Sequence, residues 1–300
     1  MVKKEEIQLR DPFVFVDNET NKYYLFGSTD PNVWGEGIGF DVYISEDLEC
    51  WDGPFPVFRP SDTFYSKENF WAPEVHEYNG NYYMFATFLR KDNGKRGTGV
   101  LYSNSLMGPF LPHSEGPVTP EDWYCLDGTL HVDGAGEPWI VFCHEWVQIA
   151  DGELCAQRLS TDLKHTIGEP VILFKASEAP WTTAFKHRRF PNRNNYVTDG
   201  PYLFHSQSGE LMMLWASFID HVYAQGIARS TTGQVLGPWV QEDEPLFRND
   251  GGHGMVFSTF EGQRMLTLHT PNKTPLERPI FIRLEELNGK IIVRRDKDGN

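Results

Sequence analysis

The feature of this 300-residue chain that most restricts its fold is a block that occurs five times. Each block begins with an apolar run, continues through a turn of Asn, Asp, Gly or Ser, and ends in a second run rich in aromatic and large aliphatic residues. This is the pattern of a β-hairpin. In chain order the blocks read RDPFVFVDNETNKYYLFGST, FWAPEVHEYNGNYYMFATF, CLDGTLHVDGAGEPWIVFCHEW, TDGPYLFHSQSGELMMLWASF and GGHGMVFSTFEGQRMLTLHT.

Further strands follow most of these hairpins. After three blocks a Ser-led strand end runs into Gly-Pro and an aromatic residue, in ISEDLECWDGPF, YSNSLMGPF and ARSTTGQVLGPW. The third block is followed by a degenerate copy, RLSTDLKHTIGEPVILF, and the fifth by FIRLEELNGKIIV. Four strands repeated five times predict an all-β fold, a five-bladed β-propeller with four antiparallel strands per blade. Because no linker divides the chain, we expect residues 1–300 to form a single domain, closed between the first and last blades.

A polar residue opens each block, at intervals of 53 to 72 residues: Asp11, Glu74, Asp127, Asp199 and His253. The innermost strand of every propeller blade begins at the same rim of the central channel. We therefore expect these five side chains to converge on one site. The longest interval contains the basic and aromatic stretch SEAPWTTAFKHRRFPNRNN, which we interpret as an irregular loop over one face, between the third and fourth blades.

The charge of the chain narrows the choice of partner. Its formal net charge of -15 argues against nucleic acid, because phosphate binding requires clustered cations, and a small neutral ligand fits better. The first residues, MVKKEEIQLRDPF, lack the apolar segment of a signal peptide, and no run approaches the roughly 18 to 20 apolar residues that span a membrane. We expect a cytoplasmic protein without a membrane partner. Its four cysteines form no CxxC pair, which predicts free thiols and no zinc site, and the oligomeric state stays open.

Five blocks that open with RDP, WAPE, LDG, DGP and GGHG, in this order, resemble glycoside hydrolase family 43 over roughly residues 8 to 285. The resemblance implies a five-bladed propeller enzyme that acts on arabinose-, xylose- or fructose-containing sugars with inversion. It also implies three carboxyl groups: a base Asp on the first blade, an Asp on the third that tunes the pKa of the proton donor, and a donor Glu that opens the fourth. Carried over to this sequence, Asp11 is the base and Asp127 the pKa modulator.

The fourth blade departs from the family pattern. Asp199 stands where Glu is usual, and its side chain is shorter by one methylene. A second candidate for the proton donor is Glu145 in VFCHEW, because the antiparallel second strand of the third blade returns to the same rim. We place Glu145 first and Asp199 second. The ordinary alternatives are that an Asp before Gly or Pro forms a turn, and that Glu145 binds sugar hydroxyls or pairs with an Arg.

Other residues are candidates for substrate binding. Trp71 and Trp146 are expected to stack on a sugar ring, with Phe70 and Trp181 as further candidates, although aromatic residues also fill the interfaces between blades. Glu74 is expected to bind substrate or support the site rather than to catalyse. His269 in TLHTPN is expected to line the pocket, and Arg278 to orient a carboxylate.

The resemblance also bears on cofactors. In relatives, the residue that matches His253 often lies next to a calcium or other ion at the channel centre, and we therefore expect such an ion beside His253. Since calcium prefers oxygen ligands, waters would have to supply most of its coordination. No organic cofactor is expected.

The hypothesis for function is an α-L-arabinofuranosidase that removes a terminal pentose from arabinan or arabinoxylan oligosaccharides, in hemicellulose degradation. The alternatives within the same class are a β-xylosidase and an endo-1,5-α-L-arabinanase. The alternative of another class is a non-catalytic propeller that binds sugar or scaffolds other proteins. Hydrolysis of arabinofuranosides distinguishes the two classes.

Overall fold

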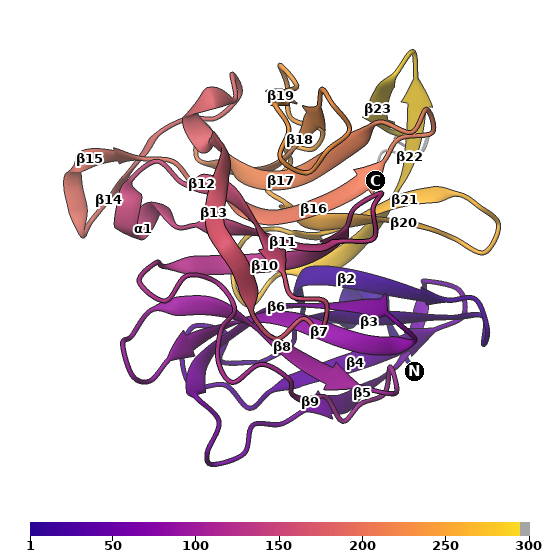
Figure 1. Ribbon diagram of the computed structural model, residues 1–300. Coiled ribbons are helices and arrows are strands. Elements are labelled where there is room, and N and C mark those ends of the chain that lie inside the picture. Colours follow the sequence, from indigo (N-terminus) through magenta and orange to yellow (C-terminus); the bar gives the residue numbers. More distant parts are fainter. Residues whose placement is uncertain (295–300) are drawn as a thin grey trace.

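The computed structural model describes residues 1–294, which form five antiparallel sheets arranged as the blades of a β-propeller (Figure 1). The innermost strands of successive blades contact each other in turn, and that of the fifth blade contacts that of the first. The predicted fold class is confirmed. No helix among the described residues is long and apolar enough to cross a membrane.

Each blade is one contiguous stretch of chain, with its first strand innermost. The inner strands are β2 (Arg10–Asp17), β6 (Ser66–Tyr78), β10 (Cys125–Val132), β16 (Asp199–His205) and β20 (Gly252–Ser258). The second strands are β3 (Lys22–Ser28), β7 (Asn81–Arg90), β11 (Pro138–His144), β17 (Leu211–Ile219) and β21 (Arg264–Thr270). The third strands are β4 (Phe40–Ser45), β8 (Arg96–Ser103), β12 (Glu153–Leu159), β18 (Val222–Ser230) and β22 (Arg278–Leu287). The outer strands are β5 (Cys50–Phe58), β9 (Leu111–Pro112), β13 (Thr166–Lys175), β19 (Trp239–Gln241) and β23 (Lys290–Val293).

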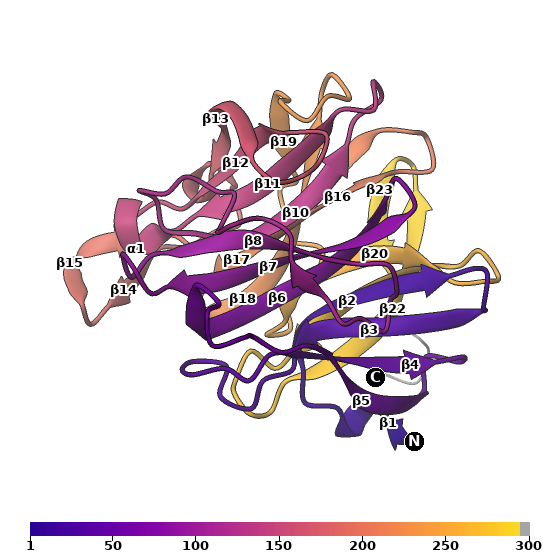
Figure 2. The same ribbon diagram turned by 60° about the horizontal axis from the view of Figure 1, so that its bottom comes forward.

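Few elements lie outside this scheme. Strand β1 (Val2–Lys3) adds to the outer edge of the first blade by pairing with β5. The remaining elements are the 3₁₀-helices η1 (Lys4–Glu6) and η2 (Ala176–Glu178), helix α1 (Trp146–Ile149), and the hairpin of β14 (Phe185–His187) with β15 (Phe190–Asn195). This hairpin corrects the expectation of an irregular loop between the third and fourth blades. Figures 1 and 2 both show it projecting from the propeller beside α1.

The core consists of apolar layers between neighbouring blades. Because both faces of a blade are covered, β10 and β17 are buried over most of their length instead of alternating between buried and exposed residues. Phe70 and Trp181, which also suggested stacking platforms in the sequence, belong to these layers. Phe70 packs against Phe88 at 5.1 Å between ring centroids, and Trp181 against Trp215 at 4.9 Å.

Candidate active site

The site begins with a bulge that recurs at the start of every inner strand. In each blade the pairing register shifts after the first one to three paired residues, and a residue with φ between 45° and 56° lies at the shift: Asp11, Ala72, Asp127, Gly200 and His253. This left-handed backbone is uncommon for residues other than glycine, and such positions are frequent at functional sites. The bulge turns the side chains at this position toward the rim of the channel.

The bulge also shows which block-opening residues are truly equivalent. Asp11, Asp127 and His253 occupy the bulge itself, whereas Asp199 lies one residue before it and Glu74 two residues after it. The signal in the sequence was proline: when the Pro of RDP, WAPE and DGP are aligned, Asp11 matches Ala72 and Gly200.

Side chains of the preceding blade satisfy the backbone amides that the bulges release from the sheets. The N–H of Asp11 donates to His269 Nδ1 at 3.1 Å, and that of Ala72 to Ser28 Oγ at 2.8 Å. The N–H of Asp127 donates to Thr87 Oγ1 at 2.8 Å, and that of Gly200 to Asp127 Oδ2 at 3.1 Å. Each donor lies one blade after its acceptor. The bulges are therefore fixed relative to one another around the ring.

A pocket of about 760 Å³ opens at this rim. Seven of the ten candidate residues from the sequence line it: Asp11, Trp71, Asp127, Glu145, Trp146, Asp199 and His253. Its volume lies in the range of about 300–1,000 Å³ that is typical of small-molecule sites. The pocket combines four carboxyl groups with a ring of aromatic side chains, which suits a neutral polyhydroxylated ligand.

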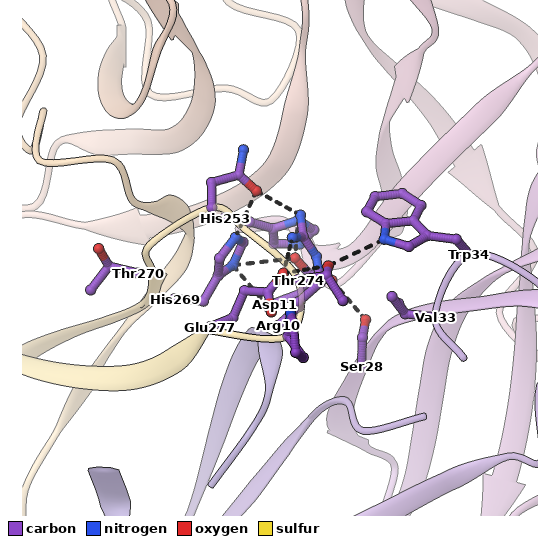
Figure 3. A network of polar contacts seen from close by, with 12 residues as sticks. Arg10, Asp11, Ser28, Val33, Trp34, His253, His269, Thr270, Thr274 and Glu277 are labelled. Atoms are coloured by element: carbon purple, nitrogen blue, oxygen red, sulfur yellow. Dashed lines mark hydrogen bonds and ion pairs between the residues drawn. The ribbon is translucent and has the colours of Figure 1, made fainter. Parts of the chain in front are cut away.

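Asp11 is held by neighbours at both of its carboxylate oxygens (Figure 3). Ser28 Oγ donates to its Oδ2 at 2.6 Å, and His253 Nδ1 lies 3.3 Å from its Oδ1. Burial opposes ionisation of Asp11, but His253, Arg10 and His269, together with the Ser28 hydrogen bond, outweigh burial and lower its pKa. Asp11 is therefore ionised across the ordinary pH range.

Asp127 and Asp199 show the opposite behaviour. Burial and the charge of Asp11 raise the pKa of Asp127 well above its usual value. Burial and the charge of Asp127 raise the pKa of Asp199 to about 7, although a hydrogen bond of 3.0 Å from the Tyr223 hydroxyl to its Oδ2 opposes the shift. Because the charge of Asp127 raises the pKa of Asp199, the two carboxyl groups titrate as a coupled pair. The pair holds a proton near neutral pH beside the ionised Asp11.

Glu145 differs from the three aspartates because it is paired with an arginine. It forms a bidentate ion pair with Arg96, in which Nε and Nη2 each lie 2.6 Å from a carboxylate oxygen, and its side chain is only 4% exposed. The Arg96 guanidinium also lies over the ring of Trp71 at 5.1 Å. A bidentate, charge-assisted pair of this kind is strong and geometrically specific. The structure thus places Glu145 at the predicted rim, with its oxygens already occupied by an Arg.

Aromatic residues form two sides of the pocket. On one side Trp34 contacts Trp71 edge to face at 5.5 Å, and the Trp71 indole N–H donates to the Val33 carbonyl. On the other side Trp146 contacts Phe185 of the β14–β15 hairpin edge to face at 4.9 Å. Trp34 is 60% exposed, so its ring is accessible to a ligand.

Three candidates lie outside the pocket lining. Glu74, displaced by the bulge, is buried with its Oε2 at 3.1 Å from His76 Nε2. His269 is fully buried behind Asp11, where burial lowers its pKa to about 4 and its Nδ1 accepts the Asp11 amide. Arg278 donates to the carbonyls of Glu5, Pro275 and Glu277, so it joins the N-terminus to the fifth blade. Only His269 therefore contacts a residue of the pocket lining, through the amide of Asp11.

The sequence reasoning missed several residues of the pocket, including Arg10, Trp34, Arg96 and Tyr223. Arg96 and Tyr223 stand at the starts of third strands, which begin at the same rim as the first strands. That position was a usable signal. Arg10 donates to Glu277 Oε1 at 2.7 Å and to Asn272 Oδ1 at 2.9 Å, and its guanidinium lies 5.2 Å from the Trp34 ring centroid (Figure 3).

The expected ion beside His253 stays a prediction. Among residues 1–294 no group of three or more His, Cys, Asp or Glu side chains is arranged to hold a metal. His253 Nδ1 instead faces Asp11 and Asp127, at 3.3 and 3.5 Å. The protein's own donors do not make a calcium site, so the chemistry below is derived without an ion.

A family model described as "Glycosyl hydrolases family 43" matches residues 6–288. Among solved structures, an endo-arabinase from Bacteroides thetaiotaomicron VPI-5482 is 43% identical, with a TM-score of 0.89 over 97% of this chain and 99% of that chain. An α-L-arabinofuranosidase from Lactobacillus brevis is 18% identical, with a TM-score of 0.73 over 94% and 92% of the two chains. RS223-β-xylosidase is 17% identical, with a TM-score of 0.73 over 98% and 97%.

Proposed function

Because this chain belongs to family 43 of the glycosyl hydrolases, it is an inverting glycoside hydrolase, and we propose that it cleaves α-L-arabinofuranosyl bonds in arabinan-type oligosaccharides. One observation carries the proposal for the chemistry: carboxyl groups in one pocket have pKa values shifted in opposite directions, lowered at Asp11 and raised to about 7 at Asp199. Inversion needs one ionised and one protonated carboxyl group on opposite sides of the sugar, about 6.5–9.5 Å apart.

Asp11 acts as the general base. Its ionised carboxylate accepts a proton from a water molecule as the water oxygen forms a bond to the anomeric carbon. The bond from that carbon to the leaving oxygen breaks, and this oxygen takes the proton of the acid. The sugar is released with the opposite anomeric configuration. The hydrogen bond from Ser28 and the amide contact with His269 support this role, because they fix the Asp11 carboxylate and its backbone.

Asp199 acts as the general acid, in place of Glu145, the first choice from the sequence. Two observations support this assignment. The pKa of Asp199 is raised to about 7 and its side chain is partly exposed in the pocket, so it can hold a proton and deliver it. Glu145, in contrast, has both carboxylate oxygens bound by Arg96, so neither oxygen is free to approach a leaving group. In this assignment Glu145 holds the Arg96 guanidinium in place against the face of the Trp71 ring.

Asp127 tunes the acid. It is more deeply buried than Asp199, and one of its oxygens accepts the Gly200 amide, so it is poorly placed to reach a leaving group. The two carboxyl groups titrate as a pair, so Asp127 carries the negative charge when Asp199 holds the proton, and this charge is the largest cause after burial that raises the pKa of Asp199. Asp127 therefore keeps the proton on the acid.

The substrate class is inferred from similarity. The structure at 43% identity, which matches almost the whole of both chains, is described as an endo-arabinase, and this favours arabinan over xylan. That relative also favours cleavage within the chain, so an endo-acting arabinanase is the first form of the proposal and release of terminal arabinose the second. The β-xylosidase likeness is at 17% identity and supports the fold alone.

Product analysis tests the substrate and the mode of cleavage. Linear α-1,5-arabino-oligosaccharides and β-1,4-xylo-oligosaccharides of equal length are incubated with the protein, and NMR records the anomer first formed. We expect arabino-oligosaccharide products of several lengths, formed with inversion. Arabinose as the sole early product would assign exo action. Cleavage of the xylo-oligosaccharides alone, or of neither series, would overturn the proposal.

A second experiment tests the acid. Asp199→Asn should reduce kcat/KM about 10²- to 10⁴-fold on a natural linkage but far less on a nitrophenyl arabinofuranoside, because an activated phenol needs little protonation. Glu145→Gln should affect both substrates alike, since it disturbs Arg96 and Trp71 instead of proton delivery. If the leaving-group dependence is found for Glu145→Gln and not for Asp199→Asn, the assignment is reversed.

A further inference from the structure

The β14–β15 hairpin is a concentration of positive charge in an acidic protein. Between Glu178 and Asp199 the sequence contains no acidic residue, and this interval includes Lys186, Arg188, Arg189 and Arg193, whereas the chain as a whole has a net charge of -15. The proposed chemistry does not involve this basic and aromatic stretch. Its position in the fold gives it a use.

The hairpin is fixed beside the pocket. Phe185, the first residue of β14, lines the pocket, and the ring of Trp146 contacts Phe185, His187 and Phe190. Arg193 Nη2 donates to the Trp146 carbonyl at 2.8 Å, so the second strand is tied to α1 as well. Both ribbon views show the hairpin beside α1 and extending away from the blades (Figures 1 and 2).

The cations of the tip face solvent. Lys186, Arg188 and Arg189 are exposed, and within residues 1–294 none of them lies within ion-pair distance of a carboxylate. The guanidinium of Arg189 lies 5.4 Å from the ring centroid of Phe190, which restricts its motion before any ligand binds. At about 3.3 Å per strand residue, the tip lies roughly 10 Å beyond Phe185.

A cationic tip at this distance suits a negative charge carried by the substrate outside the pocket. The remainder of the protein repels an anionic sugar chain, since its net charge is strongly negative. The hairpin offsets that repulsion within the Debye length of about 8–10 Å. Arginine is the side chain best matched to a carboxylate, because its planar fork can donate two parallel hydrogen bonds.

We propose that the β14–β15 hairpin is a subsite for a uronic acid, a sugar unit whose carboxylate binds Arg188 and Arg189 while the neutral arabinosyl bond is cleaved in the pocket. This deepens the proposed function and rests on it. The substrate class is then an arabino-oligosaccharide that carries an acidic sugar near the cleaved bond. The proposed subsite requires no charge on the substrate other than this carboxylate.

The test uses a matched pair of substrates and a matched pair of variants. The substrates are an arabino-oligosaccharide linked to a uronic acid and the same compound with its carboxyl group reduced to an alcohol. The variants are Arg188→Gln with Arg189→Gln at the tip, and Lys164→Gln with Lys290→Gln as a control of equal charge change. Lys164 and Lys290 are exposed. Lys164 lies in the turn between β12 and β13, and Lys290 is the first residue of β23 after the turn that follows β22, so both lie at the ends of third strands that point away from the pocket rim.

We expect the tip variant to lower kcat/KM about threefold to tenfold on the acidic substrate and to leave the reduced substrate within about twofold of wild type. The control variant should change neither. The preference of the wild type for the acidic substrate should shrink as salt is raised. Equal cleavage of both substrates by the wild type, or equal loss on both in the tip variant, would overturn the subsite while leaving the proposed function standing. Cleavage of neither substrate by the wild type would instead overturn the proposed function.

Discussion

Single residues in this pocket differ in protonation because their neighbours differ. Asp11 and Asp199 carry the same side chain and line the same cavity. Asp11 is surrounded by groups that favour a negative charge, and Asp199 by burial and by a second carboxyl group that disfavour it. His253 lies between Asp11 and Asp127, within 3.5 Å of both, and reduces their mutual repulsion. A short acid at the fourth blade is thus compatible with the chemistry, since its environment sets its pKa.

The pH dependence of kcat/KM follows from these shifts. The active form has Asp11 ionised and Asp199 protonated. Activity should therefore fall as pH rises through about 7, where Asp199 loses its proton, and on the acid side only below 3.8, the ordinary value that Asp11 lies under. In Asp127→Asn the alkaline limb should move to lower pH, because the charge that raises the pKa of Asp199 is removed.

The matched control for this pH profile is Asp52→Asn. It also removes one negative charge, but the Asp52 side chain is 63% exposed on the outer strand of the first blade. Its profile should coincide with that of the wild type. An unmoved alkaline limb in Asp127→Asn would show that Asp127 does not tune the acid.

At the scale of elements, the bulge that opens each inner strand decides which side chains enter the pocket. Its tolerance for side chains differs between blades. Asp11, Ala72, Asp127 and His253 carry a Cβ at a positive φ, whereas the fourth blade has Gly200. A Cβ added at Gly200 would lie 2.6 Å from the imidazole carbons of His253. The absence of a side chain there leaves space for the histidine between the two aspartates.

Gly200→Ala should therefore damage both stability and activity. Left-handed backbone costs about 1 kcal/mol for alanine, and the clash with His253 adds about 1–3 kcal/mol. The control is Gly209→Ala, which also has a positive φ, but where an added Cβ meets nothing within 4 Å. Thermal unfolding and kcat/KM should show a larger loss for Gly200→Ala in both measurements. Equal losses for the two variants would mean that the contact with His253 is unimportant.

The elements also show how far sequence reasoning reaches. Hairpins are local, and the turns between their strands carry Asn, Asp, Gly or Ser, with Asn79-Gly80 as the clearest case, so five repeats and their strand order were predictable. The rim positions of Asp11 and Asp127 followed from that repeat. The bulge offset that removes Glu74 from the pocket was missed, although the alignment of the prolines in RDP, WAPE and DGP signals it.

The contacts that distinguish the two candidate acids could not be predicted from the sequence. The Arg96–Glu145 pair joins the second and third blades, and nothing in either local motif specifies the partner. The hydroxyl of Tyr223 reaches Asp199 from a third strand of the same blade, outside the repeated hairpin. Both contacts bear on the choice between the two acids, which is why the sequence alone left that choice open.

At the scale of the whole molecule, the ring formed by residues 1–294 closes without an exchanged strand, because each blade is made from one contiguous stretch of chain. The first and fifth blades meet in the stack of Trp51 on Phe281, at 5.7 Å, and in the ion pair of Arg10 with Glu277, at 2.7 Å. The side chain of Glu277 is fully buried. It also accepts the Thr274 hydroxyl at 2.6 Å. Arg10 also precedes Asp11 in the sequence and helps to lower its pKa, so the same residue closes the ring and favours the ionised form of the base.

Glu277→Ala should open this closure, because it leaves Arg10 buried without its partner. Loss of one member of a buried pair costs about 3–5 kcal/mol, or roughly 6–15 °C in Tm for a chain of this size. Glu277→Gln keeps the hydrogen-bond geometry and should lose less, while Glu49→Ala, which breaks the surface pair with Lys4, should lose at most about 1 kcal/mol.

The contribution of Glu277 to stability should also depend on pH. Burial raises the pKa of Glu277, but hydrogen bonds from Thr274, its own backbone amide and Arg10 outweigh burial and lower it below 4.5. The stabilisation is therefore present above pH 4.5 and lost on acidification, so the Tm values of wild type and Glu277→Ala should converge below that pH. A Tm difference that is small at pH 7, or that does not change with acid, would show that this pair does not hold the ring closed.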